Sequence, residues 1–413
     1  MRKILLMTAA ITMLYCSFHV NSSLAFSAPL DLTGVTARED TLEKNDDKVK
    51  RQNTSLSGYV SNIYSLRSLL PEAGWLNDNL IHNRLDFNWF ISPNLTFSAG
   101  MRNRVVTGEM IKYIPDYRES FERDLGWFGL SENLISDSSF LLSSGFDRLF
   151  FDYQHGKFSI TVGRQRINWG QSLVWNPNDV FNSYSLFDFD YPERPGSDAI
   201  RIRYFKDEQI SLELAAKVDY HKQKTIAGLF RINKWNYDFQ FLAGWMNDQD
   251  YVVGTGWSGG IKGAGFRGEI TYLYPRHKNA ENQDVLVATV SGDYTFPSTL
   301  MLQLDFLYNT QTSIEGLQQS LWSFNAPPSS VKNLMFSEFN LYAAATYNIT
   351  PLLKSNISGI LMRKIDGYYL EPSLSYSLSN NAEISLILQH LRLQEEPYKG
   401  DNTSVFTRLK IGF

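Results

Sequence analysis

Cysteine is almost missing from this chain of 413 residues, since the single one, Cys16, lies close to the N-terminus. Without that segment the chain has no thiol, which excludes disulfide frameworks, Cys-ligated zinc and cysteine nucleophiles. A basic excess is missing too, because 39 Lys and Arg stand against 43 Asp and Glu. Nucleic-acid-binding domains are usually basic, with clustered Lys and Arg, so we expect no nucleic-acid partner.

Long apolar runs are also lacking. Beyond residue 30 no uninterrupted apolar stretch approaches the roughly 18 residues that a transmembrane helix needs, so a helical membrane protein is excluded. The N-terminus differs, because Arg2 and Lys3 precede an apolar run and small residues lead up to Ala25. This is the pattern of a cleaved secretory signal. Its removal takes the formal net charge from −4 to −6, since it carries only those two charges.

What the chain does contain is a hydrophobic pattern with a period of two. In the segment 81–91, Leu85, Phe87 and Trp89 share one parity, whereas Arg84 and Asp86 share the other. Such alternation places each parity on one face of a β-strand. Aromatic residues make up 14% of the chain, and many stand at strand ends on the apolar parity. A membrane-spanning barrel carries its interfacial rings at these positions.

The spacing of turn signals gives the number of strands. Short turns are predicted at 92–94, 155–156, 207–208, 235–236, 263–264, 297–298, 350–351 and 380–381. Variable connections alternate with them at 67–78, 107–143, 167–197, 218–222, 246–250, 275–284, 310–336, 364–367 and 394–402. We therefore predict an all-β fold, a transmembrane antiparallel up-and-down β-barrel of about 18 strands with short periplasmic turns and long extracellular loops. Sixteen strands is the alternative count, and a soluble propeller or stacked sandwich is the competing fold.

The last strand carries a further signal. Apolar residues occupy every second position from Val405 to the terminal Phe413. This resembles the C-terminal signal that Gram-negative outer-membrane barrels present to their insertion machinery. The resemblance implies the bacterial outer membrane as location, with its lipid and that machinery as partners. The predicted organisation is a signal peptide (1–25), an N-terminal periplasmic linker (26–53) and the barrel (54–413) with an inward-folded loop at 167–198.

One wall of the predicted barrel is rich in arginine. The polar parity of neighbouring strands carries Arg84, Arg102, Arg104, Arg148, Arg201 and Arg203. Between them, Arg164 and Arg166 share the parity of the apolar Ile160 and Val162, which would place each in lipid at a cost of about 2–4 kcal/mol near the midplane. A β-bulge at Gly163 would return both to the lumen. We predict that bulge and a column of up to eight arginines.

The connection 167–198 follows this wall and combines many aromatic rings with acidic residues. Such rings are expected to pack inward on the barrel wall rather than to face water. Its acidic residues, Asp179, Asp188, Asp190 and Glu193, would then face the arginines across a narrowed aperture. This arrangement resembles general diffusion porins, whose third loop folds inward and opposes an arginine ladder. The segment 163–170 (GRQRINWG) is similar to a string in uncharacterised porin-like outer-membrane proteins.

These features predict a porin-like channel for passive diffusion of small hydrophilic solutes. The arginines favour anions and the loop acids favour cations, and we lean to anions. The alternatives are a substrate-selective channel for sugars or organic anions, and a non-conducting barrel for surface adhesion. None of the six histidines has the spacing of a catalytic or metal site, so we expect no enzyme, no metal and no cofactor. Whether the chain is a monomer or a homo-oligomer is left open.

Overall fold

The computed structural model describes residues 53–70, 74–114, 117–122, 124–183, 193–279, 282–312, 330–394 and 399–413. The predicted signal peptide, and all but residue 53 of the predicted linker, lie outside the described residues. Within the described ranges, nineteen strands form one antiparallel sheet, and β1 (Thr54–Leu70) pairs with β19 (Gly400–Gly412) to close it. No helix in these ranges is long and apolar enough to span a membrane.

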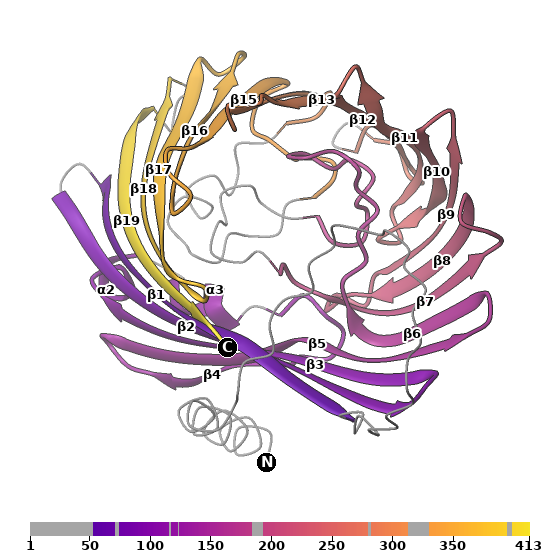
Figure 1. Ribbon diagram of the computed structural model, residues 1–413, viewed down its shortest axis with the longest axis horizontal. Coiled ribbons are helices and arrows are strands. Elements are labelled where there is room, and N and C mark those ends of the chain that lie inside the picture. The colour runs from indigo at the N-terminus through magenta and orange to yellow at the C-terminus, as the bar shows by residue number, and fades with distance from the viewer. Residues whose placement is uncertain are drawn as a thin grey trace, which may run out of the picture.

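Eighteen of the strands form the wall of a barrel, which Figure 1 shows in a view along its axis. Besides β1 and β19 they are β2 (Gly74–Ser92), β3 (Leu95–Gly108), β5 (Phe140–His155), β6 (Phe158–Gln165), β7 (Ser197–Phe205), β8 (Ile210–Val218), β9 (Lys224–Lys234), β10 (Tyr237–Met246), β11 (Asp250–Ile261), β12 (Ala264–Pro275), β13 (Val285–Thr295), β14 (Met301–Asn309), β15 (Phe339–Asn348), β16 (Leu353–Met362), β17 (Gly367–Ser379) and β18 (Ala382–Leu393). The prediction of an antiparallel barrel with 18 strands is confirmed, and the alternative count of sixteen is wrong.

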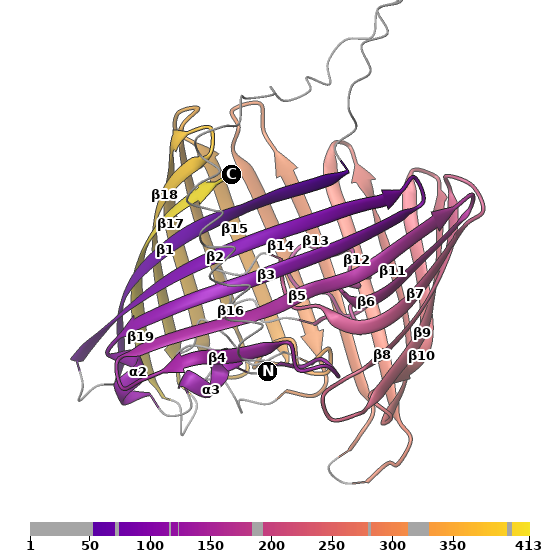
Figure 2. The same ribbon diagram turned by 90° about the horizontal axis from the view of Figure 1, so that it is seen from below.

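The connections differ in length between the two ends of the barrel. Each of the eight predicted short turns joins two neighbouring strands at one end, which we call the turn end. The longer connections lie at the other end, the loop end. Figure 2 shows that β1, β2, β3 and β5 cross the wall at a strong slant. These strands have 14 to 19 residues, whereas β6, β7 and β8 have only 8 or 9.

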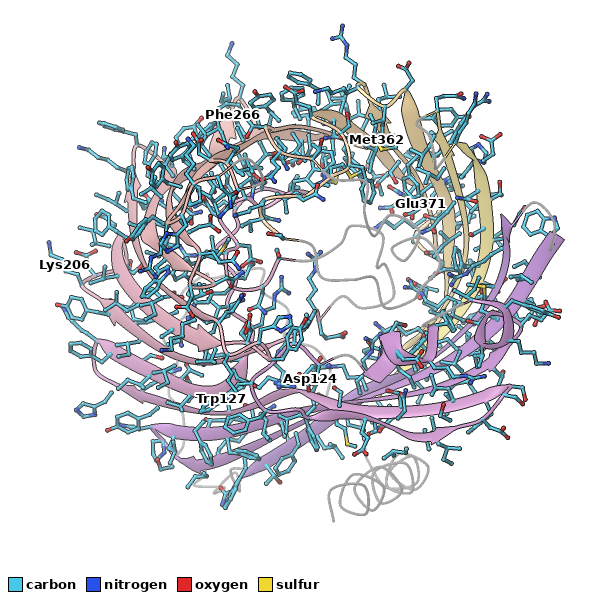
Figure 3. All side chains as sticks on the ribbon, turned by 180° about the vertical axis from the view of Figure 1, so that it is seen from behind. Asp124, Trp127, Lys206, Phe266, Met362 and Glu371 are labelled. Carbon is cyan, nitrogen blue, oxygen red and sulfur yellow. The ribbon has the colours of Figure 1, made fainter. Side chains whose placement is uncertain are left out.

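Residues at alternate positions of each strand face either the lipid or the lumen, as β14 illustrates. Leu302, Leu304 and Phe306 are 41–57% exposed, whereas Asp305 and Leu307 are fully buried. A polar lumen beneath an apolar outer surface is the arrangement of a membrane barrel. In Figure 3, Lys206 projects away from the barrel and Glu371 lies on the lumenal side.

The nineteenth strand, β4 (Ser131–Ser136), patches the wall at the loop end. It pairs with β5 at Gly145 and the residues before it, beyond the last residue that pairs with β6. Just ahead of β4, Gly126 bridges to Asp219, which follows β8. The segment 124–136 therefore completes the wall between β5 and β8 where β6 and β7 have already ended.

Candidate channel constriction

Insertions from the loop end reach into the lumen. The first carries the short helices α2 (Met110–Tyr113) and α3 (Tyr117–Glu122). Both belong to one buried cluster with lumenal wall residues of β1, β2, β3, β5, β18 and β19. The apolar members are Ile63, Leu76, Leu80, Val106, Met110, Ile111, Ile114, Tyr117, Phe121, Leu141, Ile387 and Phe406. This insertion covers the wall on the side of β1, as Figure 1 shows.

The second insertion follows β6. Residues 166–183, which we call the inward segment, share one buried cluster with lumenal residues of β7 to β14 and β16 to β18, and with Val331, Met335 and Phe336 from the connection before β15. The buried side chains that it contributes are Ile167, Trp169, Val174, Trp175, Val180 and Phe181. Trp169 is fully buried and meets the ring of Phe181 edge to face, with centroids 4.8 Å apart. The rings of this connection therefore lie in an apolar layer between the inward segment and the wall.

Small wall residues make room for the inward segment. Gly254 and Gly256 lie on the lumenal parity of β11, and a Cβ at Gly254 would overlap the side-chain oxygen of Asn178. Next to them, Ala215 and Ala227 pair in register and are both buried in the same cluster. Small residues on the lumenal parity of neighbouring strands are a sequence signal for the close approach of a loop.

Two wall carboxylates hold the inward segment by hydrogen bonds. Glu269 on β12 accepts the backbone N–H groups of Gln171, Ser172 (2.7 Å) and Asn178 (2.8 Å). On β8, Glu213 accepts the indole N–H of Trp169 at 2.5 Å. Neither glutamate was predicted as a site residue. Both are at least 96% buried and carry polar contacts that an apolar wall could not make.

The lumenal arginines on β2 and β5 form ion pairs and hydrogen bonds with nearby carboxylates and backbone carbonyl groups. Arg84 forms ion pairs with Asp86 (2.7 Å) and Asp147 (2.5 Å). The guanidinium of Arg148 donates to the carbonyl oxygens of Glu193 (2.5 Å) and Arg194 (2.9 Å), which end the connection after the inward segment. Arg84 and Arg148 of the predicted column therefore hold nearby side chains and backbone in place, in addition to contributing positive charge to the lumen.

The next two arginines are buried behind the first insertion. Arg102 donates to His82 Nε2 at 3.0 Å. Arg104 donates to the carbonyl oxygen of Phe121 at 2.6 Å, and its guanidinium lies 4.8 Å from the centre of that ring. Both side chains are less than 10% exposed. Arg104 thus fastens α3 to the wall.

A cluster of three arginines surrounds Glu213, and we call it the arginine cluster. Arg201 makes a two-pronged contact with Glu213 at 2.7 and 2.8 Å. Arg203 lies 3.5 Å from Asp152 and donates to Ser159 at 2.7 Å. The third member, Arg231 on β9, interacts electrostatically with Glu213, Arg201 and Asp238 but forms no ion pair within the described residues. Arg231 was not among the arginines predicted from the sequence.

The predicted bulge at Gly163 is wrong. Pairing of β6 with β5 and with β7 is continuous through this residue, although its φ of +120° favours glycine. The register shift lies on β5 instead, where Asp147 is the extra residue. Arg164 therefore keeps the parity of Ile160 and Val162 and does not join the lumenal column.

Arg164 is instead enclosed by the wall patch. It pairs with Asp198 (2.7 Å) and Asp124 (2.7 Å) and donates to the carbonyl oxygen of Phe128 (2.5 Å). Arg166 comes after β6 ends, at the start of the inward segment, and lies in the electrostatic neighbourhood of Asp179. The cost of an arginine in lipid is avoided here by covering the side chain rather than by reversing its parity.

The four loop acids fall in different places. Asp179 is 1% exposed on the inward segment, and burial raises its pKa to about 6, with Arg166 opposing the shift. Glu193 accepts the hydroxyl of Tyr59 at 3.0 Å. Asp188 and Asp190 lie outside the described residues.

Acidic residues line the opposite side of the lumen. Glu371 on β17 accepts a hydrogen bond from Gln389 at 2.8 Å, and Glu383 on β18 lies 3.3 Å from Arg408. Asp305 on β14 accepts from Gln303 at 2.8 Å. The lumenal arginines are therefore concentrated on β2 to β9, whereas lumenal carboxylates lie on both sides, including Asp86 and Glu213 on the arginine side.

The closed antiparallel wall, the apolar outer surface and the charged lumen define an outer-membrane barrel of the porin type. Neither the protein-family models nor the curated proteins contain a match. Solved structures do match: Acinetobacter baumannii OccAB4 and Pseudomonas aeruginosa OpdQ each have a TM-score of 0.56 and 9% identity, covering 88% of this chain and 99% of theirs. Pseudomonas aeruginosa OccK2 (OpdF) has a TM-score of 0.55 and 9% identity, covering 87% of this chain and 98% of its own. The fold of this chain is that of Gram-negative outer-membrane porins.

Proposed function

We propose that this chain is a passive outer-membrane channel for small hydrophilic solutes, which passes anions more readily than cations. The observation that carries the proposal is the arginine cluster beside the inward segment. Arg201 and Arg203 lie within ion-pair distance of Glu213 and Asp152, whereas Arg231 interacts with Glu213 and Asp238 only at longer range, so its positive charge is the least neutralised of the three. A barrel of this width is not filled by wall side chains, so a narrowing loop sets its aperture.

Screening limits the size of the expected preference. An ion about 7 Å from one guanidinium in water gains or loses about 0.6 kcal/mol, which is about a threefold change in local concentration. Physiological salt screens charges over about 8 Å. The arginine cluster therefore supports a moderate selectivity rather than tight binding.

Small organic anions are the solutes that we favour. The solved structure of OccK2 is a complex with glucuronate, a sugar that carries one carboxylate. A carboxylate and a guanidinium match in geometry, because two parallel N–H groups can face two oxygens. Arg231 has this capacity available within the described residues, since none of its N–H groups is engaged in an ion pair there.

Planar-bilayer conductance with a salt gradient tests the proposal. The wild type is expected to show stepwise conductance and an anion-selective reversal potential. Arg231→Ser should lower the ratio of chloride to potassium permeability by about two- to threefold, because one charge shifts the two ions in opposite directions and salt screening reduces both shifts. Arg276→Ser is the matched control, because Arg276 is exposed outside β12 and stacks over Trp245. Its reversal potential should stay that of the wild type.

Two results would contradict the proposal. A folded, inserted barrel that conducts nothing would favour a surface-interaction role. Equal shifts from Arg231→Ser and Arg276→Ser would mean that the arginine cluster does not control permeation.

A further inference from the structure

The inward segment bends around Glu269 in an unusual way. Backbone N–H groups of Gln171, Ser172 and Asn178 converge on its two oxygens, and the side chain of Glu269 is fully buried. Converging backbone N–H groups form an anion-binding concavity, which commonly holds a bound ion or phosphate. Here the anion belongs to the barrel wall. The turn 171–178 and the strand β12 are thereby joined by charge-assisted hydrogen bonds, the stronger kind.

Side-chain contacts extend this junction. Thr271, two residues along β12, donates its hydroxyl to Asn178 Oδ1 at 2.8 Å, and the Asn178 amide donates to the carbonyl of Thr255 at 3.0 Å. Gln240 on β10 donates to the carbonyl of Trp169 at 2.7 Å. Three wall strands therefore bond one short stretch of the inward segment.

Glu213 makes a second junction with a different consequence. One of its oxygens accepts both the indole N–H of Trp169 and the Nε–H of Arg201. The inward segment and the arginine cluster thus share a carboxylate. Glu213 therefore holds the inward segment and also neutralises part of the positive charge that Arg201 presents to solutes in the lumen.

We propose that Glu269 and Glu213 are positioning residues that latch the inward segment against the wall and thereby set the aperture of the channel. The proposal rests on the function proposed above, in which this segment narrows the lumen. Glu269 acts mainly on position, because it is fully buried and accepts backbone N–H groups of the inward segment rather than bonding a member of the arginine cluster. Glu213 acts on position and on charge selectivity together.

Thiol accessibility measures the latch without any need for conduction. The chain has no cysteine after Cys16, so Ser172→Cys introduces a single thiol next to the Glu269 oxygens. Ser172 is 9% exposed, and its labelling by a maleimide in vesicles should be slow. Glu269→Gln replaces one acceptor oxygen by an amide that faces a backbone N–H. Labelling should then become about tenfold faster, as expected for the loss of a charge-assisted hydrogen bond.

Glu383→Gln is the matched control, because Glu383 is a lumenal carboxylate that bonds Arg408 and Ser385 instead. It should leave the labelling rate unchanged. Thr271→Val is the milder test, since it removes only the hydroxyl bond to Asn178, and a smaller increase is expected. Heat-modifiable migration in gels establishes that each variant is folded.

Bilayer recordings complete the test. Glu269→Gln should increase open-channel noise and shift the reversal potential less than Glu213→Gln, which should increase noise and shift the reversal potential toward anions because it also frees the charge of Arg201. Unchanged labelling in both Glu269→Gln and Thr271→Val would overturn the latch. Faster labelling in a barrel that never conducts would support the latch and reject the proposed channel function, so the two failures are distinguishable.

Discussion

Arg164 and Arg231 are the same residue type on the same half of the barrel, yet they meet opposite surroundings. Arg164 is 4% exposed, and all five of its N–H groups have acceptors in Asp124, Asp198 and two backbone carbonyls. Arg231 faces the lumen and forms no ion pair within the described residues. The comparison shows that parity and covering segments, not residue type, decide whether an arginine is structural or available to solutes.

The covering segment explains the difference. Asp124 accepts the backbone N–H groups of Gly126 (2.9 Å) and Leu130 (2.6 Å), while Asp198 accepts that of Phe128 (2.8 Å). These bonds fold the stretch 124–130 over the top of β6 and β7. Arg164 is therefore the centre of the wall patch, whereas Arg231 has no ion-pair partner among the residues that the structure describes.

Removing Arg164 should give the largest effect. Arg164→Ala leaves two buried carboxylates without their cation, which typically costs about 3–5 kcal/mol. The unfolding midpoint of the refolded barrel in denaturant should fall accordingly. Arg231→Ala should leave that midpoint within about 0.5 kcal/mol of the wild type, as expected of a side chain outside such networks. Equal losses from the two substitutions would remove the distinction between a structural and a solute-facing arginine.

A substitution at Gly126 tests the same patch without changing charge. A Cβ at this position would overlap Arg164 Nη2 and Asp198 Oδ2. Gly126→Ala should therefore destabilise the barrel by about 1–3 kcal/mol, the usual range for overpacking. Gly292→Ala is the matched control, because its Cβ would have an ordinary contact at 3.5 Å. An unfolding midpoint of Gly126→Ala equal to that of Gly292→Ala would show that the patch does not press on Arg164.

The barrel itself was predictable from the sequence because its signals are local. Alternation along single strands and turn residues between them are each readable within about ten residues. All eight predicted turns join the strands that they were expected to join. Closure follows from physics, since lipid cannot satisfy an open sheet edge.

The candidate site was less predictable because it depends on packing between distant segments. Arg164 and Asp124 are 40 residues apart, and no local pattern reveals that one covers the other. Arg231 was missed for a related reason. In the middle of β9 the lumenal parity carries Ala227 and Leu229, which are buried in the same cluster as the inward segment, so this part of the strand looks apolar on both faces. Lumenal residues that lie beneath an inserted segment are shielded from water and can be apolar, so the alternation of polar and apolar residues is lost there.

Asp179 extends the comparison to Arg166, the arginine that follows Arg164 by two residues. Burial raises the pKa of Asp179 from 3.8 to about 6, and the charges of Arg166, Lys217 and Arg194 lower it only in part. An ionised carboxylate is therefore disfavoured where the inward segment packs. The buried charge therefore lowers the stability of the folded inward segment at pH values above 6. This loss of stability disappears as the pH falls toward 4, because the folded protein then holds a proton on Asp179.

The smallest effect that we predict follows from this titration. Each unit of pKa difference corresponds to about 1.4 kcal/mol between the protonation states, so the inward segment should be held more firmly at pH 5 than at pH 8. Open-channel noise should fall on acidification through pH 6. Asp179→Asn, which keeps the shape and lacks the charge, should show low noise at both values. If this variant keeps the pH dependence of the wild type, a group other than Asp179 titrates. In that case the interaction between Arg166 and Asp179 would not affect the channel, unlike the ion pairs of Arg164, which stabilise the wall.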